Sequence, residues 1–164
     1  TRALVARLQA HVAVLGLVGL QRVADPRAGV DMVDVEQSQL VDAGGIRWAG
    51  LGDRWAGKDA PGFLHRPPGR APAIVVAHNP DSAMDLLPGD AAIVLAGHTH
   101  GGQIRIPWLY RKVIPSAHGF DRGEQVAPAA AGPVRVFTTH GVGEVGLPLR
   151  LFNPPTIDGL QLRP

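Results

Sequence analysis

Two uninterrupted hydrophobic runs lie in the middle of the chain, each bounded by turn-forming residues. They are Ala73–Ala77 and Ala91–Ala96. Runs of this length are typical of strands that are buried on both faces of a parallel sheet. Each run leads into a loop with a histidine, His78 after the first and His98 after the second. The carboxyl ends of neighbouring parallel strands share one edge of a sheet, so the pattern predicts an α/β layer with its chemistry at that edge.

Weaker patterns flank these two runs. Leu40–Asp42 and Ile46–Leu51 are strand-like and are joined by a glycine-rich link, which together predict a β-hairpin. After the first hydrophobic run, Asp81 or Ser82 is placed to cap a short helix that continues through Leu87.

The last third of the chain predicts a β-rich half that packs on the first. Short strand candidates are separated by glycines and prolines: Gln103–Ile106, Val134–Thr138, Leu147–Phe152 and Leu160–Leu162. The alanine-rich run Ala127–Ala131, interrupted by Pro128, predicts an exposed loop.

The first part of the chain has no sustained pattern. Ala3–Ala10 predicts a short amphipathic helix and His11–Gly16 a buried strand, but Leu17–Gln39 keeps neither periodicity for long. The most hydrophobic early segment, Ala10–Leu20, is too short for a membrane span and lacks the features of a signal peptide. Because the sequence shows no targeting or transmembrane segment, it leaves both a cytoplasmic and a membrane-associated protein open.

Composition restricts the classes of function. The 164 residues suffice for one domain with a core, and a hydrophobic content of 45% is that of a globular protein. The net charge is only +2 and the arginines are scattered, so no basic stripe indicates a nucleic-acid partner. There is no cysteine, so any metal ion must be bound through nitrogen and oxygen ligands.

The candidate metal ligands are His78, His98 and His100. His98 and His100 are separated by one residue and flanked by Gly97 and Gly101. Neutral imidazole is a common metal ligand, and a glycine-flanked loop lets the backbone bring such rings together. On a strand the pair would share one face, whereas on a tight loop the two rings would diverge toward two ions.

Simpler interpretations apply to other histidines and to the pair itself. His11, His65 and His118 are isolated, and we expect them to make only local hydrogen bonds. A pair of this kind also occurs in cupin-type barrels and in histidine-triad hydrolases. This chain has Gln103 where a cupin would have glutamate, and Gly102 where a histidine triad would have its third histidine.

Two motifs together indicate a family. His78 lies in Val-Val-Ala-His-Asn-Pro-Asp, and the later histidines lie in Leu-Ala-Gly-His-Thr-His-Gly-Gly-Gln. In this order they resemble the second half of the calcineurin-like metallophosphoesterases, in particular a small bacterial type that often carries a membrane anchor or export signal. The tail Gly141–Pro155 is similar to that subgroup as well. The resemblance covers residues 40–164.

The resemblance implies a fold, a cofactor and a substrate. The fold would be part of a four-layer α/β/β/α sandwich whose N-terminal half is missing here. A two-metal site holding Mn, Fe or Zn would hydrolyse a phosphoester substrate, with His78 and His98 on one ion and His100 on the other. No side chain of this chain is assigned a catalytic acid or base role. A missing N-terminal segment would be the route to any membrane association.

Three motifs that complete the family's metal site are absent from the sequence: Asp-x-His, Gly-Asp-x-x-Asp and Gly-Asn-His-Asp. His11–Gly16 is similar to the strand before the last of these, but Leu17 and Val18 stand where the family has asparagine and histidine. We therefore expect a divergent or truncated segment at residues 1–39, and the C-terminal part of a phosphoesterase domain at residues 40–164.

The missing carboxylates limit the expected activity. Two cations a few ångströms apart repel each other when no carboxylate lies between them. We expect at most one metal ion in this chain and impaired hydrolysis. The alternative is a non-catalytic fragment or degenerate domain that binds at most one metal ion.

A few further side chains are weaker candidates. Asn79–Asp81 is interpreted as a turn and helix cap. Arg105 and Arg111 are of a type that binds phosphate, although surface arginines are common. His140 is assigned no role. The tryptophans are expected to pack in the interior: Trp48, Trp55 and Trp108.

Overall fold

A computed structural model describes residues 22–25, 30–34, 38–43, 45–65, 70–129 and 132–161. The strands are β1 (Arg22–Asp25), β2 (Val30–Asp34), β3 (Gln39–Ala43), β4 (Ile46–Leu51), β5 (Ala73–Ala77), β6 (Ala91–Ala96), β7 (Gly123–Ala129) and β8 (Gly132–Thr138). The helices of the described residues are short 3-10 turns: η1 (Gly62–Leu64), η2 (Pro80–Asp85), η3 (His100–Gly102) and η4 (Tyr110–Lys112).

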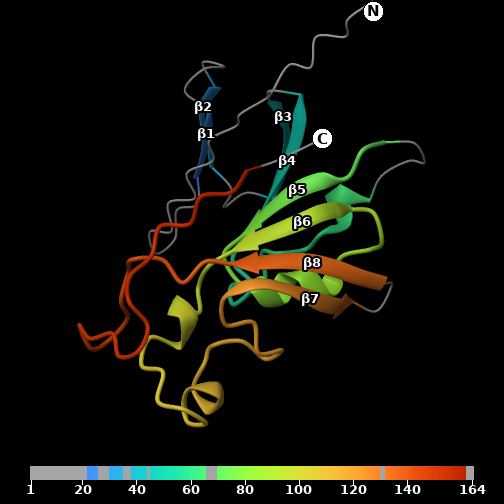
Figure 1. Ribbon diagram of the computed structural model, residues 1–164. Helices are drawn as coiled ribbons and strands as arrows, with labels where there is room; N and C mark the ends of the chain where they lie inside the picture. The colour runs from blue at the N-terminus through green and yellow to red at the C-terminus, as the bar shows by residue number, and fades with distance from the viewer. Residues whose placement is uncertain are drawn as a thin grey trace, which may run out of the picture.

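One mixed sheet organises the molecule. Its strand order is β3-β4-β5-β6-β8-β7, while β1 and β2 form a separate antiparallel pair (Figure 1). The four inner strands run parallel to one another, and the edge strands β3 and β7 are antiparallel to their neighbours. The expected α/β fold is therefore confirmed as a mixed sheet with few helical residues.

The central strands lie where the hydrophobic runs predicted them. β5 is buried along its whole length, and β6 is buried over its second half. Ala77 pairs with Ala96 at the ends of the two parallel strands, so the loops that follow begin side by side. The predicted hairpin is confirmed as well, since β3 pairs antiparallel with β4.

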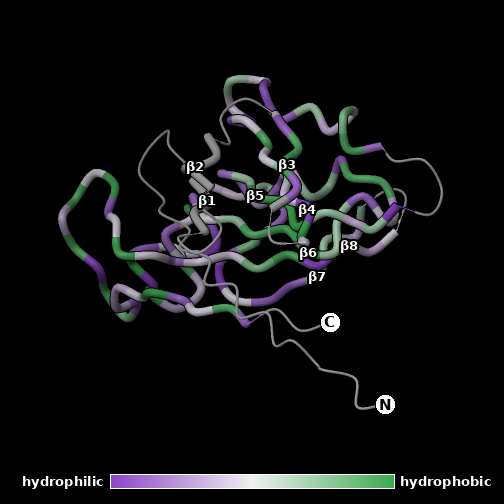
Figure 2. Tube along the Cα trace, turned by 90° about the horizontal axis from the view of Figure 1, so that it is seen from above, coloured by the Kyte–Doolittle hydropathy of each residue, from purple (hydrophilic) through white to green (hydrophobic). Residues whose placement is uncertain are grey.

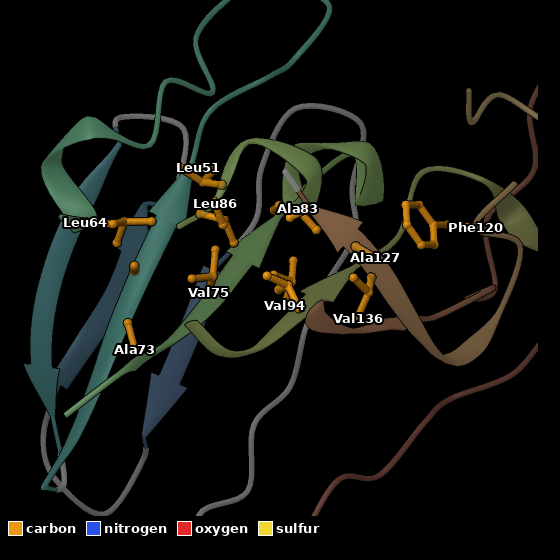
Figure 3. Close-up of a cluster of buried hydrophobic side chains, with 14 residues drawn as sticks. Leu51, Leu64, Ala73, Val75, Ala83, Leu86, Val94, Phe120, Ala127 and Val136 are labelled. Atoms are coloured by element: carbon orange, nitrogen blue, oxygen red, sulfur yellow. The ribbon is translucent and has the colours of Figure 1, made fainter. Parts of the chain in front are cut away.

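The larger hydrophobic core covers one face of the sheet. Val75, Val94 and Val136 project from adjacent strands, and Ala83 and Leu86 cover them from η2 and the residue that follows it (Figure 3). The three valines have no solvent-exposed surface. Complete burial of such a side chain stabilises a fold by about 1.5–3 kcal/mol, so this face anchors the strands that carry the candidate site.

The opposite face of the sheet has a smaller core. Its buried members are Trp48, Ile74, Val76 and Leu95. Partly buried hydrophobic residues pack around them, among them Phe137 and Leu160. Alternation along β5 explains the two cores, because successive side chains of a strand point to opposite faces.

Three predicted elements differ in the structure. The expected helix from Asp81 or Ser82 is the 3-10 helix η2, and Asn79 caps it by accepting a hydrogen bond from the Asp81 amide. Gln103–Ile106 and Leu147–Phe152 are not strands, since only the single bridge between Ile104 and Leu151 joins them. The described part of Leu160–Leu162 is not a strand either.

The prediction of an exposed loop at Ala127–Ala131 was wrong over its described residues. Ala127–Ala129 belongs to the edge strand β7, and Ala127 is fully buried. Pro128 does not interrupt β7, because a proline is tolerated in an edge strand, where one side needs no donor. The helix expected at Ala3–Ala10 and the strand expected at His11–Gly16 lie outside the described residues.

Hydrophobic residues also occur outside the two cores. The tube in Figure 2 shows them along the central strands and in the outlying loop that carries residues 141–149. In that loop Val142, Val145 and Leu147 are exposed, so hydrophobic packing does not hold it in place. Within the described ranges, no helix has the length and hydropathy needed to cross a bilayer.

Candidate metal centre

The candidate site lies at the carboxyl ends of β5 and β6, where His78 and His98 meet. His98 Nδ1 is 2.9 Å from His78 Nε2, and the ring centroids are 4.6 Å apart. One of these two nitrogens must carry a proton and the other a lone pair, because two protons or two lone pairs would repel. The sequence predicted this juxtaposition from the ends of two buried strands.

The loop that carries His98 is strained. His98 has φ 66°, His100 has φ 48° and Gln103 has φ 38°, all in the left-handed region. For residues other than glycine this conformation costs about 1–2 kcal/mol each. Of the two geometries that the sequence left open for His98 and His100, the structure therefore has the tight loop. Other contacts must hold that loop in place.

Two glycines let the loop approach its neighbours closely. A Cβ atom at Gly101 would lie 2.6 Å from the Cβ of His140 and 2.8 Å from Asn153 Oδ1. A Cβ atom at Gly102 would lie 2.9 Å from the ring of Tyr110. Both glycines also have positive φ, so the Gly-Gly pair of the motif is required by backbone conformation and by space.

His100 is oriented by a backbone carbonyl. Its Nδ1 lies 2.9 Å from Gly143 O. A carbonyl only accepts hydrogen bonds, so Nδ1 carries the proton and Nε2 keeps its lone pair. This tautomer is the one in which a histidine binds a metal ion through Nε2.

Gln103 holds the loop that contains this carbonyl. Its Nε2 donates to the carbonyls of Val145 and Leu147 at 3.1 and 2.8 Å, and its Oε1 accepts from the Val145 amide at 2.8 Å. These bonds replace the missing hydrophobic packing of the outlying loop. Gln103 thus positions the backbone of the loop that contains Gly143, and it affects the histidine rings only through that backbone.

Asn153 and Arg150 support the same loop from the tail. Asn153 Nδ2 donates to His100 O at 2.6 Å, and its Oδ1 lies 3.0 Å from His140 Nδ1. The Arg150 guanidinium donates to His140 O at 2.8 Å and also contacts the carbonyls of His100 and Gly143. Asn153 is fully buried. Apart from the family-like tail, no local sequence pattern indicates these roles. His140, to which the sequence assigns no role, supports the loop through Asn153 and Arg150.

The surroundings keep the two contacting imidazoles neutral. Burial is the largest effect that lowers the pKa of His98, and His78 and His100 add to it, so the pKa falls to about 4. Burial likewise lowers the pKa of His78, although the Asp53 carboxylate partly opposes it. Neutral imidazoles offer lone pairs, which is the form that a metal ion requires.

Comparison with curated proteins gives relatives of one kind. The chain is 36% identical over 116 residues to phosphodiesterase YaeI of Escherichia coli (strain K12), which covers 69% of the chain and 40% of the relative. It is 33% identical over 125 residues to the metallophosphoesterase YkuE of Bacillus subtilis (strain 168), covering 76% of the chain and 43% of the relative. The chain belongs to the calcineurin-like metallophosphoesterase superfamily. A further relative, at 32% identity over 121 residues, is the UDP-2,3-diacylglucosamine pyrophosphatase LpxG of Chlamydia muridarum (strain MoPn / Nigg), covering 68% of the chain and 36% of the relative.

The chain spans about two-fifths of the length of these curated relatives, 40% and 43% for the first two. No family model and no solved structure matches it. Membership in the superfamily implies dependence on divalent metal ions.

The residues present fit part of a metal-binding set. Two imidazole nitrogens that bind one zinc ion at about 2.1 Å are about 3.0–3.4 Å apart, close to the spacing of His78 Nε2 and His98 Nδ1. His98 Nε2 is also buried without a hydrogen-bond partner. In the part of the chain that the structure describes, no three His, Cys, Asp or Glu side chains are arranged to hold a metal ion. The described residues at this position thus offer imidazole nitrogens as possible donors, without a complete set of ligands around them.

Arg105 has a structural role in this chain. Its Nη1 donates to Gly101 O at 2.7 Å and forms an ion pair of 2.9 Å with Asp121. The guanidinium also lies over the Tyr110 ring, 4.0 Å from its centroid. Arg111 is exposed and contacts the Tyr110 hydroxyl. A phosphate-binding role for Arg105 would have to displace the contacts that hold the histidine loop.

The remaining candidates divide between confirmed and wrong predictions. His65 makes a local contact with Asp90, 3.0 Å from Nδ1 to the carboxylate, as expected. His118 is exposed, and His11 lies outside the described residues. Trp48 packs in the core as predicted. Trp55 and Trp108 are 72% and 75% exposed, so the prediction that they pack in the interior was wrong.

Proposed function

We propose that this chain is part of a metal-dependent phosphoester hydrolase in which His78 and His98 bind one divalent ion and His100 faces a second position. The observation that carries the proposal is the 2.9 Å approach of His98 Nδ1 to His78 Nε2 at the ends of adjacent parallel strands. Relatives named as a phosphodiesterase, a metallophosphoesterase and a pyrophosphatase support it.

The chain's own residues would bind and orient. A bound Mn, Fe or Zn ion supplies positive charge that polarises a phosphoryl oxygen. His78 and His98 are neutral at pH 7, because burial lowers their pKa values, so each ring keeps one nitrogen lone pair. For both facing nitrogens to bind the ion, the proton between them would move to the other nitrogen of its ring, and neither imidazole would have to ionise. His100 keeps Nε2 available because Gly143 O holds its Nδ1 proton. Their contribution is positioning and charge compensation.

We propose further that the chain as it stands binds at most one ion and hydrolyses phosphoesters poorly. The sequence lacks the Asp-x-His, Gly-Asp-x-x-Asp and Gly-Asn-His-Asp motifs that complete the family site. Histidines alone can hold one zinc ion with an open fourth position, but two adjacent cations need a carboxylate between them. The same observation favours the second candidate function, a non-catalytic domain that binds one ion.

Metal stoichiometry and turnover test the proposal on the full 164-residue chain. After loading with Zn²⁺ or Mn²⁺ and gel filtration, elemental analysis should find no more than about one ion per chain. His78→Ala and His98→Ala should each lower the affinity for the ion at least about tenfold, since each removes a nitrogen donor. His118→Ala is the matched control, because this histidine is exposed and should leave metal affinity unchanged.

Hydrolysis of bis(4-nitrophenyl) phosphate separates the two candidate functions. Slow turnover that disappears in His98→Ala supports an impaired hydrolase, whereas one bound ion with no turnover supports the non-catalytic domain. Two ions per chain with efficient turnover would overturn the proposed impairment. Equal metal affinity in the wild type and His98→Ala would overturn the assignment of the ligands.

A further inference from the structure

Trp55 is an exposed aromatic side chain at the candidate metal centre. Its ring centroid lies 4.5 Å from that of His98, with the two ring planes at 87°. In such an edge-on contact only one ring presents its face to the other, and 72% of Trp55 remains exposed to solvent. Trp48, by contrast, is buried in the core. The large ring of Trp55 therefore lies against a candidate metal ligand and keeps most of its surface open to solvent.

The loop that presents Trp55 is firmly held. Asp53 Oδ1 accepts a hydrogen bond from the Trp55 amide at 2.9 Å, and Asp53 O accepts one from the Lys58 amide at 2.9 Å. Arg54 Nη1 donates to Asp59 at 2.7 Å and also pairs with Asp85. These contacts form a compact turn whose tip is the tryptophan, so little conformational entropy remains to be lost when the indole contacts a ligand.

The same loop is joined to the segment that follows His78. Asp59 accepts a hydrogen bond from the hydroxyl of Ser82 at 2.8 Å, and Ser82 lies buried in η2. Asp85, the second partner of Arg54, is the last residue of η2. The position of Trp55 is therefore fixed relative to the loop after β5 as well as to His98 after β6.

We propose that Trp55 is a binding platform for a planar aromatic group carried by the phosphoester substrate. The inference rests on the proposed function, because the phosphoryl group must be held at His78 and His98. A substituent on that phosphorus would lie within reach of an indole whose centroid is 4.5 Å from the His98 ring. Stacking on a tryptophan accepts any planar ring, since it needs a face and not a particular hydrogen-bond pattern.

The composition of the loop favours a planar ring over an acyl chain. Around Trp55 the turn carries the exposed charged residues Asp53 and Lys58 and the small residues Ala56 and Gly57. One indole offers enough area to cover one aromatic ring, whereas a long acyl chain needs a continuous hydrophobic surface. The planar group has two possible sources, an aryl leaving group or a nucleobase.

Matched pairs of phosphate esters test the platform and distinguish the two sources. The metal-loaded full chain is titrated by calorimetry with phenyl phosphate and methyl phosphate, and separately with adenosine 5′-monophosphate and ribose 5-phosphate. Trp55→Ala should weaken the binding of phenyl phosphate, of adenosine 5′-monophosphate or of both by about five- to tenfold. The affinity for the non-aromatic ester of the same pair should change by less than about twofold. Trp55→Phe should restore most of the difference. The exposed Trp108→Ala is the control, and it should change neither member of a pair.

The indole signals give a readout that does not depend on turnover. In a ¹⁵N-labelled sample the Trp55 indole N–H, assigned from Trp55→Phe, should shift on addition of the aromatic ester, while the Trp108 signal should not. Equal affinities of the wild type and Trp55→Ala for all four esters would overturn the platform alone. If methyl phosphate and ribose 5-phosphate fail to bind the wild type, the proposed phosphoester site is overturned, and the platform with it.

Discussion

The left-handed backbone of His98, His100 and Gln103 is the feature on which the candidate metal centre depends most directly. The glycine-flanked pattern was sufficient to indicate the two histidines as candidate ligands and to suggest a loop around them. It was not sufficient to predict their conformations, because strain at one residue is stabilised by partners elsewhere in the chain. Asn153, which donates to His100 O, lies 53 residues downstream, and no local pattern connects the two.

Gly101→Ala should destabilise the protein by about 3 kcal/mol or more in urea denaturation. A left-handed alanine costs about 1–2 kcal/mol, and the new Cβ would also lie 2.6 Å from the Cβ of His140, a contact that only movement of the loop can relieve. Metal affinity should fall with it, since the displaced loop carries His98 and His100.

Gly119→Ala is the matched control for this substitution. Gly119 has φ +75°, but a Cβ there would meet nothing within 4 Å. It should therefore show the conformational cost alone, about 1–2 kcal/mol. Equal losses in the two variants would mean that close packing around Gly101 does not matter.

At the scale of elements, buried strands were predicted correctly from the sequence, whereas a partly exposed edge strand was not. β5 and β6 are inner strands with hydrophobic residues facing both ways, so their pattern was unambiguous. The edge strand β7 was missed, because its exposed positions and Pro128 have the composition of a loop. Gln103–Ile106 has the alternating pattern of a strand, but its polar side chains hold loops together. Gln103 hydrogen-bonds to the Val145 amide, and Arg105 forms an ion pair with Asp121.

The helix η2 is tied to the segment before β7 by one buried carboxylate. Asp81 accepts hydrogen bonds from the Ser116 hydroxyl and the Ala117 amide, both at 2.7 Å. Asp81→Ala should cost about 2–3 kcal/mol in urea denaturation, because it removes these bonds and leaves the two donors without a partner.

Asp42→Ala is the control for loss of a carboxylate at the surface. The side chain of Asp42 is 70% exposed and pairs only loosely with Arg47 at 3.3 Å. Its removal should change stability by less than about 1 kcal/mol. A loss for Asp81→Ala as small as that for Asp42→Ala would contradict the role assigned to the buried carboxylate.

At the scale of the whole molecule, long-range polar contacts connect the sheet to the loops around the site. Asp121 is central to them: its backbone carbonyl accepts from Thr99, and its carboxylate accepts from Arg105 and Tyr110. Arg105 in turn donates to Gly101 O in the histidine loop. Such a network is set by tertiary contacts, so the sequence indicated the family and the sheet but not the way the loops are joined.

The network predicts that the free energy of unfolding depends on pH in the acidic range. Burial alone would raise the pKa of Asp121, but Arg105, the Arg122 amide and the Tyr110 hydroxyl outweigh it, and the pKa is lowered below 3.8. A carboxyl group with a depressed pKa in the folded state stabilises the protein above its unfolded-state pKa. This contribution should be lost as the pH falls through 3.8 toward the lower folded-state pKa.

Urea denaturation at a series of acidic pH values measures this effect. The free energy of unfolding of the wild type should fall more steeply below about pH 4 than that of Asp121→Asn, which has no carboxylate to protonate. Asp42→Asn is the control and should retain the wild-type slope. Parallel curves for the wild type and Asp121→Asn would contradict the assignment.

The downstream position of the supports also sets an order of events during protein synthesis. His100 leaves the ribosome 43 residues ahead of Gly143, whose carbonyl orients its ring, and 53 residues ahead of Asn153. In the nascent polypeptide, His100 is therefore synthesised before the residues that hold its loop in the left-handed conformation. Translation is slow compared with loop motion, so the histidine loop has time to sample other conformations before its partners are made. The final conformation of the histidine loop is thereby deferred until the residues around Asn153 have been made and have docked.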